Sequence, residues 1–351
     1  MSVTETASEA IVAGYHRQTR NRLVRVAGFA AATMAAILFD ILTGPAFLSP
    51  LEVLVTMFGV ADDPMLSAIV FSVRLPMTLM AVIVGASLGI AGVEMQTILG
   101  NPLASPYTLG FSAAAGFGAA LAILFAFQLP LLATLTVPVV SFVFATFACL
   151  IVYGLARARG VTSEIMILAG IATLFLFQSA QSLVQYLAAP EVLQQIVFWL
   201  FGSMLKASWT SVAVSGAILV FAVALLVPDF WRLTALRLGD ERVRALGINV
   251  DRLRLRIFLA VSLLTAGAVA FVGTIGFVGL VAPHLARMAV GEDQRFLVPA
   301  SALSGAFVMA AASVVSKSIS PGAVIPIGIV TAIIGVPFLF ALILKSRRSF
   351  W

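Results

Sequence analysis

The sequence predicts an all-α, polytopic membrane protein, built as a single bundle of about ten transmembrane helices. Hydrophobic residues make up 61% of the 351 positions and charged residues only 10%, whereas soluble proteins contain roughly 25% charged residues. No polar stretch is long enough to build a soluble domain. We therefore divide the chain into an N-terminal tail (1–25), one membrane domain (26–344) and a C-terminal tail (345–351).

Apolar runs of about 20 residues, the length needed to cross a bilayer, recur along the whole membrane domain. Basic residues in short loops favour the cytoplasmic side, so the arginines of 17–25 and the basic residues of 345–348 place both tails in the cytoplasm. This arrangement requires an even number of crossings. The apolar runs, nine in all, are 26–43, 66–98, 107–127, 130–153, 162–188, 209–228, 255–290, 297–316 and 324–344.

Nine runs give an odd number of crossings. The run 255–290 removes this conflict, because it is long enough to hold two helices. It is interrupted by Gly267, Gly273, Gly276 and Pro283, so it can cross once and return as a short or broken helix. Irregular backbone at membrane depth is tolerated only where it is buried in protein or lines a cavity. We expect ten crossings.

The loop 43–65 contains three acidic residues and no basic residue, so it is expected outside. Ser49 followed by Pro50 predicts a short interfacial helix there, because serine caps helices and proline is favoured at the first helical position. In the next run, Gly85, Gly89 and Gly92 recur at the spacing that lets helices pack closely in membranes.

The longest strongly charged segment is the loop 228–256, which contains seven of the 21 lysine and arginine residues. Its positive excess places it in the cytoplasm. Asp240 can cap a short helix that ends just before Gly247, and Asn249 can cap the next helix. A folded basic loop between spans is either a docking surface for a cytoplasmic partner or a loop that lies on the membrane surface.

Several classes of site are excluded or disfavoured. The single cysteine, Cys149, excludes a disulfide framework, and the widely separated His16 and His284 disfavour a His/Cys metal site. No GxxxxGK[ST] phosphate loop is present, so the chain cannot itself be a P-loop ATPase. The net charge of +6 follows from the positive-inside bias and does not indicate nucleic-acid binding. No cofactor is expected.

Four strings interrupt the apolar sequence with polar or helix-breaking residues. They are Arg74-Leu75-Pro76, NPLASPYTLG from Asn101, LGDERVRALGINV in the basic loop and GFVGLVAPHLAR from Gly276. With IPIGIVTAIIGVPF near the C-terminus, they appear in an order and at a spacing that resemble a known family from about Arg74 onwards. It is the FecCD or BtuC-like family, the permease subunits of iron-siderophore, haem and vitamin B12 ABC importers.

The resemblance implies a BtuC-like fold and a type II importer. Two permease subunits, identical or different, would form a central pathway, two cytoplasmic ATP-binding subunits would power it, and a substrate-binding protein would deliver the substrate from outside. The chain itself would not be an enzyme. The loop 229–256 would be the coupling element that sits in a groove of the ATPase. The coupling residues implied are Leu238, Gly239, Asp240, Glu241, Arg242, Arg244, Leu246 and Gly247.

Binding-protein docking is the role that the resemblance implies for Arg74 and Lys317. Arg74 matches the first arginine of the family's RLPR string, whose second arginine is here Met77. Lys317 aligns with the basic residue of a string near the last span, whose aspartate is here Ser313. For Arg74, simple anchoring at the membrane interface is the alternative.

A cytoplasmic gate is the role that the resemblance implies for Asn101, Pro102, Leu103 and Ser163. Asn101 has a structural alternative, because its side chain can bond backbone that Pro102 leaves free. We add Glu94 as a pathway candidate, since an acid inside an apolar span is costly unless paired, hydrated or protonated. For Glu94 the alternative is a buried structural hydrogen bond.

The expected function is that of a permease in the bacterial inner membrane, importing a bulky ferric siderophore. Haem or cobalamin is the alternative substrate. The rival from another class is an ion-coupled secondary transporter, which uses acids and broken helices near the midplane. Glu94 is the only acid that we expect well inside a span, and this disfavours the rival.

Overall fold

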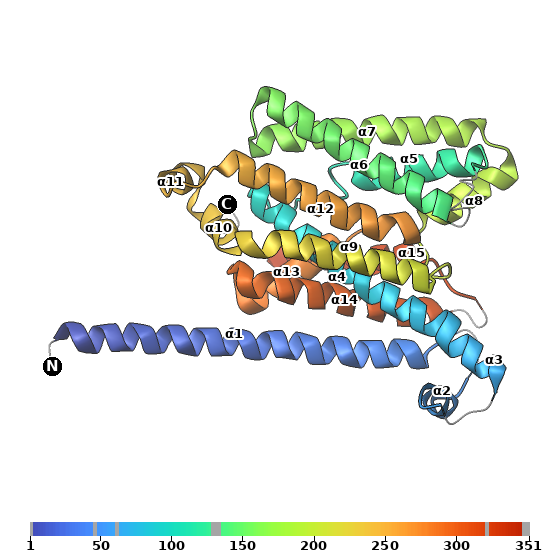
Figure 1. Cartoon of the computed structure of the whole chain (residues 1–351), viewed down its shortest axis with the longest axis horizontal. Coiled ribbons are helices and arrows are strands. Elements are labelled where there is room, and N and C mark those ends of the chain that lie inside the picture. Colours follow the sequence, from blue (N-terminus) through green and yellow to red (C-terminus); the bar gives the residue numbers. More distant parts are fainter. Residues whose placement is uncertain (1–2, 45–47, 60–62, 128–134, 320–322, 346–351) are drawn as a thin grey trace.

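The computed structural model describes residues 3–44, 48–59, 63–127, 135–319 and 323–345, and within these ranges all regular structure is helical. Figure 1 shows an elongated bundle, with α10 and α11 at one end and α2 and α3 at the other; we call these the α11 end and the α2 end. The α-helices of the first half are α1 (Val3–Leu42), α2 (Pro50–Met57), α3 (Pro64–Ser67), α4 (Leu75–Leu99), α5 (Phe111–Leu124), α6 (Thr136–Arg159) and α7 (Ser163–Leu187). Those of the second half are α8 (Pro190–Leu200), α9 (Trp209–Leu226), α10 (Phe230–Ala235), α11 (Asp240–Ala245), α12 (Val250–Val272), α13 (Val278–Val290), α14 (Gln294–Ser318) and α15 (Ile327–Lys345).

Ten apolar helical segments agree with the predicted ten crossings. Seven helical stretches among the described residues are long and apolar enough to span a membrane, and α5, α13 and the first part of α15 are shorter apolar helices. A π-helix, Ala68–Arg74, joins α3 to α4 and extends that span. Two short 3-10 turns, Val227–Asp229 and Leu236–Leu238, flank α10.

The predicted break in the apolar run 255–290 is confirmed. α12 ends at Val272, and α13 begins at Val278 after a turn in which Gly273 adopts a φ of 79°. The end of α13 lies back at the α11 end, because Glu292 just beyond it pairs with Arg237, close to the start of α12. The two helices therefore cross and return as predicted.

α1 differs from its prediction. The sequence suggested a polar tail followed by a span at 26–43, and one continuous helix, Val3–Leu42, contains both. Forty helical residues measure about 60 Å, twice the roughly 30 Å of hydrocarbon in a bilayer. The polar segment therefore continues the first span as helix, and Figure 1 shows it projecting past the rest of the α11 end.

The interfacial helix α2 is confirmed, with Ser49 as its cap and Pro50 at its first position. The Ser49 hydroxyl accepts a hydrogen bond from the Glu52 N–H (3.2 Å), and the Glu52 carboxylate accepts one from the Ser49 N–H (2.6 Å). These bonds hold the pKa of Glu52 below its ordinary value, the backbone bond contributing most. Such a reciprocal capping box fixes where the helix begins.

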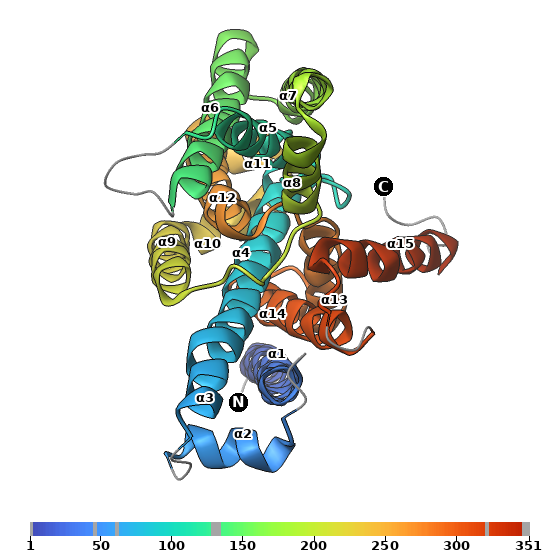
Figure 2. The ribbon, with the colours of Figure 1, turned by 90° about the vertical axis from the view of Figure 1, so that its right-hand side faces the viewer.

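α4 is the central helix of the bundle, and Figure 2 shows it with α9, α12, α13 and α14 around it. A Cβ added to Gly85 or Gly89 would overlap backbone carbonyl oxygens of α14, and one added to Gly92 would overlap a backbone carbonyl oxygen of α13. The predicted close packing at these glycines is confirmed. Because α4 meets α13 and α14 backbone to backbone, it fixes the positions of these two helices.

Candidate functional site

α11 is a single short helix bounded by glycines. Gly239 has a φ of 89° at its N-cap and Gly247 a φ of 79° just after it, both in the left-handed region that favours glycine. Asn249 caps α12 as predicted, its side chain accepting from the Arg252 N–H at 2.9 Å. Asp240 is not a cap, contrary to the sequence prediction. It is the first residue of α11, and its carboxylate bonds another helix.

The outer surface of α11 combines apolar and charged side chains. Leu238, just before the helix, is 51% exposed, and Leu246, just after it, is 64% exposed. Glu241, Arg242 and Arg244 are exposed between them. Val243 is buried beneath and anchors the helix to the bundle. The predicted coupling residues Leu238, Glu241, Arg242, Arg244 and Leu246 are therefore all accessible at the surface.

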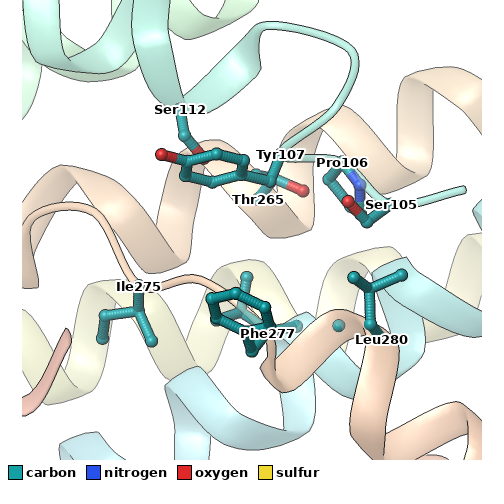
Figure 3. A pocket seen from close by; sticks show the side chains of 10 residues that line it. Ser105, Pro106, Tyr107, Ser112, Thr265, Ile275, Phe277 and Leu280 are labelled. Atoms are coloured by element: carbon teal, nitrogen blue, oxygen red, sulfur yellow. The ribbon is translucent and has the colours of Figure 1, made fainter. Parts of the chain in front are cut away.

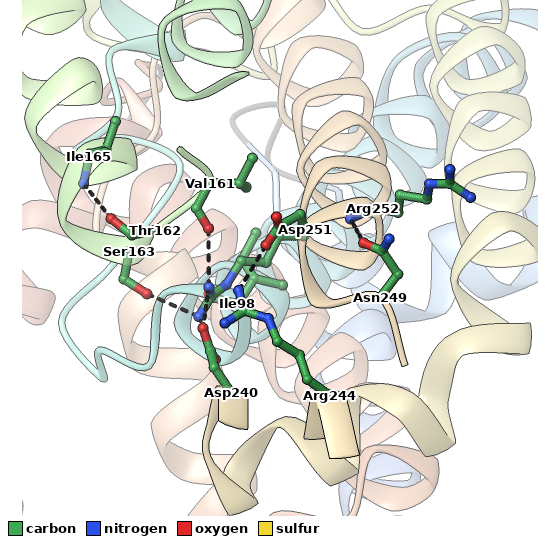
Figure 4. Close-up of polar contacts among 11 residues, drawn as sticks. Ile98, Val161, Thr162, Ser163, Ile165, Asp240, Arg244, Asn249, Asp251 and Arg252 are labelled. Carbon is green, nitrogen blue, oxygen red and sulfur yellow. Dashed lines mark hydrogen bonds and ion pairs between the residues drawn. The ribbon is translucent and has the colours of Figure 1, made fainter. Parts of the chain in front are cut away.

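Arg254 of α12 connects α11 to the interior of the bundle, although its side chain is only 8% exposed. Its guanidinium donates to both carboxylate oxygens of Asp240, at 2.7 and 3.0 Å. It also donates to the Ile98 carbonyl (2.9 Å), the Val161 carbonyl (3.2 Å) and the Ser163 hydroxyl (3.3 Å). Figure 4 shows these partners approaching from separate segments of the chain.

The contacts of Arg254 join four segments at one point. Ile98 lies at the end of α4, Val161 in the turn before α7, Ser163 at the start of α7, and Asp240 at the start of α11. A bidentate arginine–carboxylate pair fixes distance and angle more strictly than a point charge can. Arg254 therefore ties the start of α11 to the end of α4 and the start of α7.

The predicted gate residues lie next to this junction. Ser163 binds Arg254 directly, and Asn101 to Leu103 begin one turn after Ile98. The Asn101 side chain accepts from the Leu103 N–H at 2.9 Å, so it shapes the turn at Pro102, as in its structural alternative. Leu103 is 53% exposed. The structure thus brings the coupling and gate predictions together.

Glu94 is not part of this junction. It is fully buried in α4, and neither carboxylate oxygen has a hydrogen-bond partner among the described residues. The charged group that acts on it is Asp229, which is itself buried and paired with Arg232 (2.6 Å) and Arg256 (3.1 Å). The structural hydrogen bond expected for Glu94 is absent from the described part of the chain.

Arg74 and Lys317, the residues predicted to dock the binding protein, both have their side chains buried inside the α2 end. Lys317 is 5% exposed and Arg74 is 2% exposed. Lys317 Nζ lies 2.8 Å from Asp40 Oδ1, and Arg74 donates to the carbonyls of Ile41 (3.2 Å) and Leu42 (2.9 Å). Their role in docking is untested and stays a prediction.

Asp40 is a functional candidate that the sequence interpretation missed. It is fully buried in α1 and accepts a hydrogen bond from the Thr78 hydroxyl at 2.5 Å as well as pairing with Lys317. The position where the family has an aspartate, one turn before Lys317, is here Ser313, which carries no charge. The carboxylate that pairs with Lys317 therefore comes from another helix, at Asp40. Glu94 is therefore not the only acid within a span. The sequence signal that could have identified Asp40 is its position as an acid inside the apolar run 26–43.

A cavity of about 20 Å³ lies where two of the quoted strings meet. Figure 3 shows Tyr107 and Ser112 on one side, with Ile275 and Phe277 on the other. This volume holds one water molecule. Phe277 adopts a φ of 66°, unusual for a bulky residue.

Comparison with known proteins gives consistent results along most of the chain. The FecCD transport family matches residues 32–345. The hemin transport system permease protein HmuU of Yersinia pestis is 35% identical over 295 residues, 84% of this chain and 88% of that protein. The molybdate import system permease protein MolB of Haemophilus influenzae is 38% identical over 289 residues, 82% of this chain and 84% of that protein. A solved metal-chelate type ABC transporter in an inward-facing conformation has a TM-score of 0.81 and 32% identity, covering 92% of this chain and 99% of that one.

Proposed function

Since this chain belongs to the FecCD transport family and is the permease subunit of an ABC importer, we propose that α11 is the contact through which a separate ATPase drives it. The chain has no phosphate loop of its own, so the energy must come from another subunit. The exposed Leu238 and Leu246 would pack in a groove of that subunit, and Glu241, Arg242 and Arg244 would pair across the interface. A short helix bounded by glycines transmits rigid-body displacement, where a flexible loop would absorb it.

The proposed assembly places the α11 end and both termini in the cytoplasm of a bacterium, with the protein in the inner membrane. The excess of arginine at the α11 end supports this orientation. Two ATP-binding subunits would bind at that end, and a second permease subunit would complete the pathway. A substrate-binding protein would dock at the opposite, α2 end. The loop 43–65 at that end contains acidic residues and no basic residue.

The observation on which this proposal depends is the junction at Arg254. A push on α11 moves Asp240, and the fork between Asp240 and Arg254 passes that movement to Ser163 and to the Ile98 carbonyl just before the gate loop. Hydrogen bonds to charged groups each contribute about 1.5–3 kcal/mol to stability. The two bonds between Arg254 and Asp240 therefore resist separation.

The test is Arg254→Gln in vesicles that contain the permease, its ATPase and its binding protein. We expect uptake to fall by roughly tenfold or more, since a charge-assisted bond is lost, while ATP hydrolysis continues. Arg254→Lys should also be impaired, because an ammonium cannot make the fork. The matched control is Arg252→Gln, which removes an exposed arginine from the same helix.

Normal uptake by a well-expressed Arg254→Gln variant would contradict the proposed role of the junction. If that variant fails to fold, Ser163→Ala is the substitute, because it removes only the 3.3 Å contact with the gate. It should lower uptake without lowering the amount of protein in the membrane.

We further propose that the substrate is a ferric siderophore. Two similar proteins support a metal chelate, since one is named for hemin and the other for a metal chelate. The apolar, glycine-rich and alanine-rich helices also suit a bulky ligand. Haem or cobalamin is the second candidate, and the molybdate permease shows that similar proteins serve different substrates.

ATP-driven accumulation should be compared for ⁵⁵Fe-siderophore, haem, cobalamin and molybdate in the same vesicles. The siderophore should accumulate fastest. Faster uptake of any other substrate would overturn the substrate proposal, while uptake driven by an ion gradient without ATP would overturn the importer mechanism itself.

A further inference from the structure

A basic pocket of about 400 Å³ lies between α1 and the end of α13, outside the elements used above. Its size is that of a small-molecule site. Figures 1 and 2 show α1 at the edge of the bundle, with only part of its length against the other helices. The lining consists of Gln18, Asn21, Arg22 and Arg25 from α1, and Arg287, Met288, Ala289, Val290 and Gly291 from the end of α13.

The lining contains three arginines and two side-chain amides but no acid. Arg22 Nη1 lies 3.4 Å from Asp293 Oδ2, just outside the pocket, and Arg287 Nε lies 3.2 Å from Glu292 Oε2. Arg25 makes no ion pair with any described residue and donates only to a backbone carbonyl. The pocket therefore presents guanidinium groups that are not neutralised within it.

The neighbouring acids do not balance this charge, because other arginines share them. Asp293 also pairs with Arg295 at 2.7 Å, and Glu292 also lies 3.5 Å from Arg237. Arg295 holds the pKa of Asp293 below its ordinary value, so that carboxylate is ionised. Counting the two acids, five arginines leave three positive charges in excess around the pocket. Arginine forks of this kind are suited to phosphate.

Apolar side chains line one edge of the pocket and continue beyond it. Met288, which lines the pocket, is 74% exposed. On α1, the apolar part of the helix begins just after Arg25, the last arginine of the pocket. A soluble anion would leave these side chains in water, whereas a lipid would cover them with its acyl chains.

We propose that this pocket binds the phosphate headgroup of an anionic phospholipid. The phosphate lies among Arg22, Arg25 and Arg287, and the acyl chains run along Met288 and the exposed face of α1. Basic pockets between transmembrane helices at the membrane surface are suited to such headgroups. Binding would fasten the long α1 to α13 at a place where protein contacts between them are few. This proposal does not depend on the coupling role of α11.

The test is native mass spectrometry of the full-length chain in detergent, with added palmitoyl-oleoyl-phosphatidylglycerol or the phosphatidylcholine with the same chains. The wild-type chain should retain phosphatidylglycerol in preference. Arg22→Gln/Arg25→Gln should lower that retention by about tenfold, since each basic residue near an anionic lipid contributes about fivefold at most. Arg22→Lys/Arg25→Lys should keep part of it, because the charge remains.

The matched control is Arg157→Gln/Arg159→Gln, which removes two exposed arginines from the end of α6 and should leave lipid retention unchanged. Equal phosphatidylglycerol retention by the Arg22→Gln/Arg25→Gln variant and the wild type would overturn the proposal. So would displacement of the lipid by an equal concentration of inorganic phosphate, which would indicate a soluble-anion site. Loss of the lipid from the wild-type chain on assembly with its ATPase subunits would show a protein interface instead.

Discussion

At the scale of single residues, the buried charges at the α2 end are the most consequential. Asp40, Lys317 and Arg74 come from α1, α14 and the segment before α4, so their contacts tie three helices together. Removing one partner of a buried ion pair typically costs about 3–5 kcal/mol, because the remaining charge is left without compensation. Replacing both partners by groups of similar volume costs much less.

We therefore expect Asp40→Asn and Lys317→Met each to lower the free energy of unfolding by about 3–5 kcal/mol. The double variant Asp40→Asn/Lys317→Met should recover much of that loss, because neither charge is then left alone. Denaturation of the purified chain, followed by helical circular dichroism, measures all three. A double variant as unstable as the sum of the single ones would show that the pair is not the source of the effect.

Docking of the binding protein remains a separate question for Arg74. If a partner's carboxylate reaches it, Arg74→Glu should weaken docking in a way that depends on salt concentration. Binding of the isolated binding protein at two salt concentrations measures this. A loss of stability with unchanged docking by the folded fraction would assign Arg74 to the internal cluster alone.

At the scale of elements, α4 and α14 pack with their backbones in direct contact. Gly85 and Gly89 face Gly305 and Ser301 so closely that backbone meets backbone. Small residues permit such contacts in membranes, where dispersion forces and close packing stabilise helix pairs. A side chain at these positions has no space, because the obstacle is backbone that cannot rotate away.

Gly89→Ala should separate α4 from α14 and lower stability by about 1–3 kcal/mol, the usual cost of overpacking. The matched control is Gly154→Ala in α6, where an added Cβ meets nothing within 4 Å. Thermal unfolding of both variants in the same detergent gives the comparison. Equal melting temperatures would contradict the packing described for α4.

At the scale of the whole molecule, α4 is held at both ends. Thr78 near its start bonds Asp40, and Ile98 near its end bonds Arg254. The binding-protein side and the ATPase side of the proposed importer therefore contact the same central helix. A rigid element contacted at both ends is a physical route for coupling between them.

The corresponding prediction concerns Arg242 and Arg244, which are exposed on α11. Charge reversal to Glu at either position should uncouple ATP hydrolysis from uptake while membrane insertion stays normal, because the ATPase contact is lost and the bundle is not. Uptake and hydrolysis are measured together in vesicles, with Arg157→Glu as a control at another helix end. Unchanged transport would refute the coupling role.

Much of this architecture could be predicted from the sequence. Local rules placed α2 from Ser49 and Pro50, the end of α11 from Gly247, and the broken helix from its glycines, because capping and turn residues act on their near neighbours. Hydropathy and charge gave the ten apolar segments. The spacing of small residues indicated the packing of α4.

The remainder depends on contacts between distant segments. Nothing local marks Arg254 as different from Arg252, because its partners lie 14 to 156 positions away. Asp40 pairs with a lysine 277 positions away, so its burial could not be inferred from its own run. The burial of Arg74 and Lys317 could not be inferred for the same reason. The length of α1 could not be inferred either, because a change from polar to apolar composition does not end a helix.

The junction at Arg254 has a consequence for the size of the coupling step. A guanidinium has five N–H donors, and the five hydrogen bonds made here are to Ile98, Val161, Ser163 and the two oxygens of Asp240. All five N–H groups of Arg254 are in use. The guanidinium therefore has no free donor with which to bind a new partner when α11 tilts. In the proposed coupling, the ATPase would have to break several of these hydrogen bonds together, so we expect small movements of α11 to leave the predicted gate residues in place.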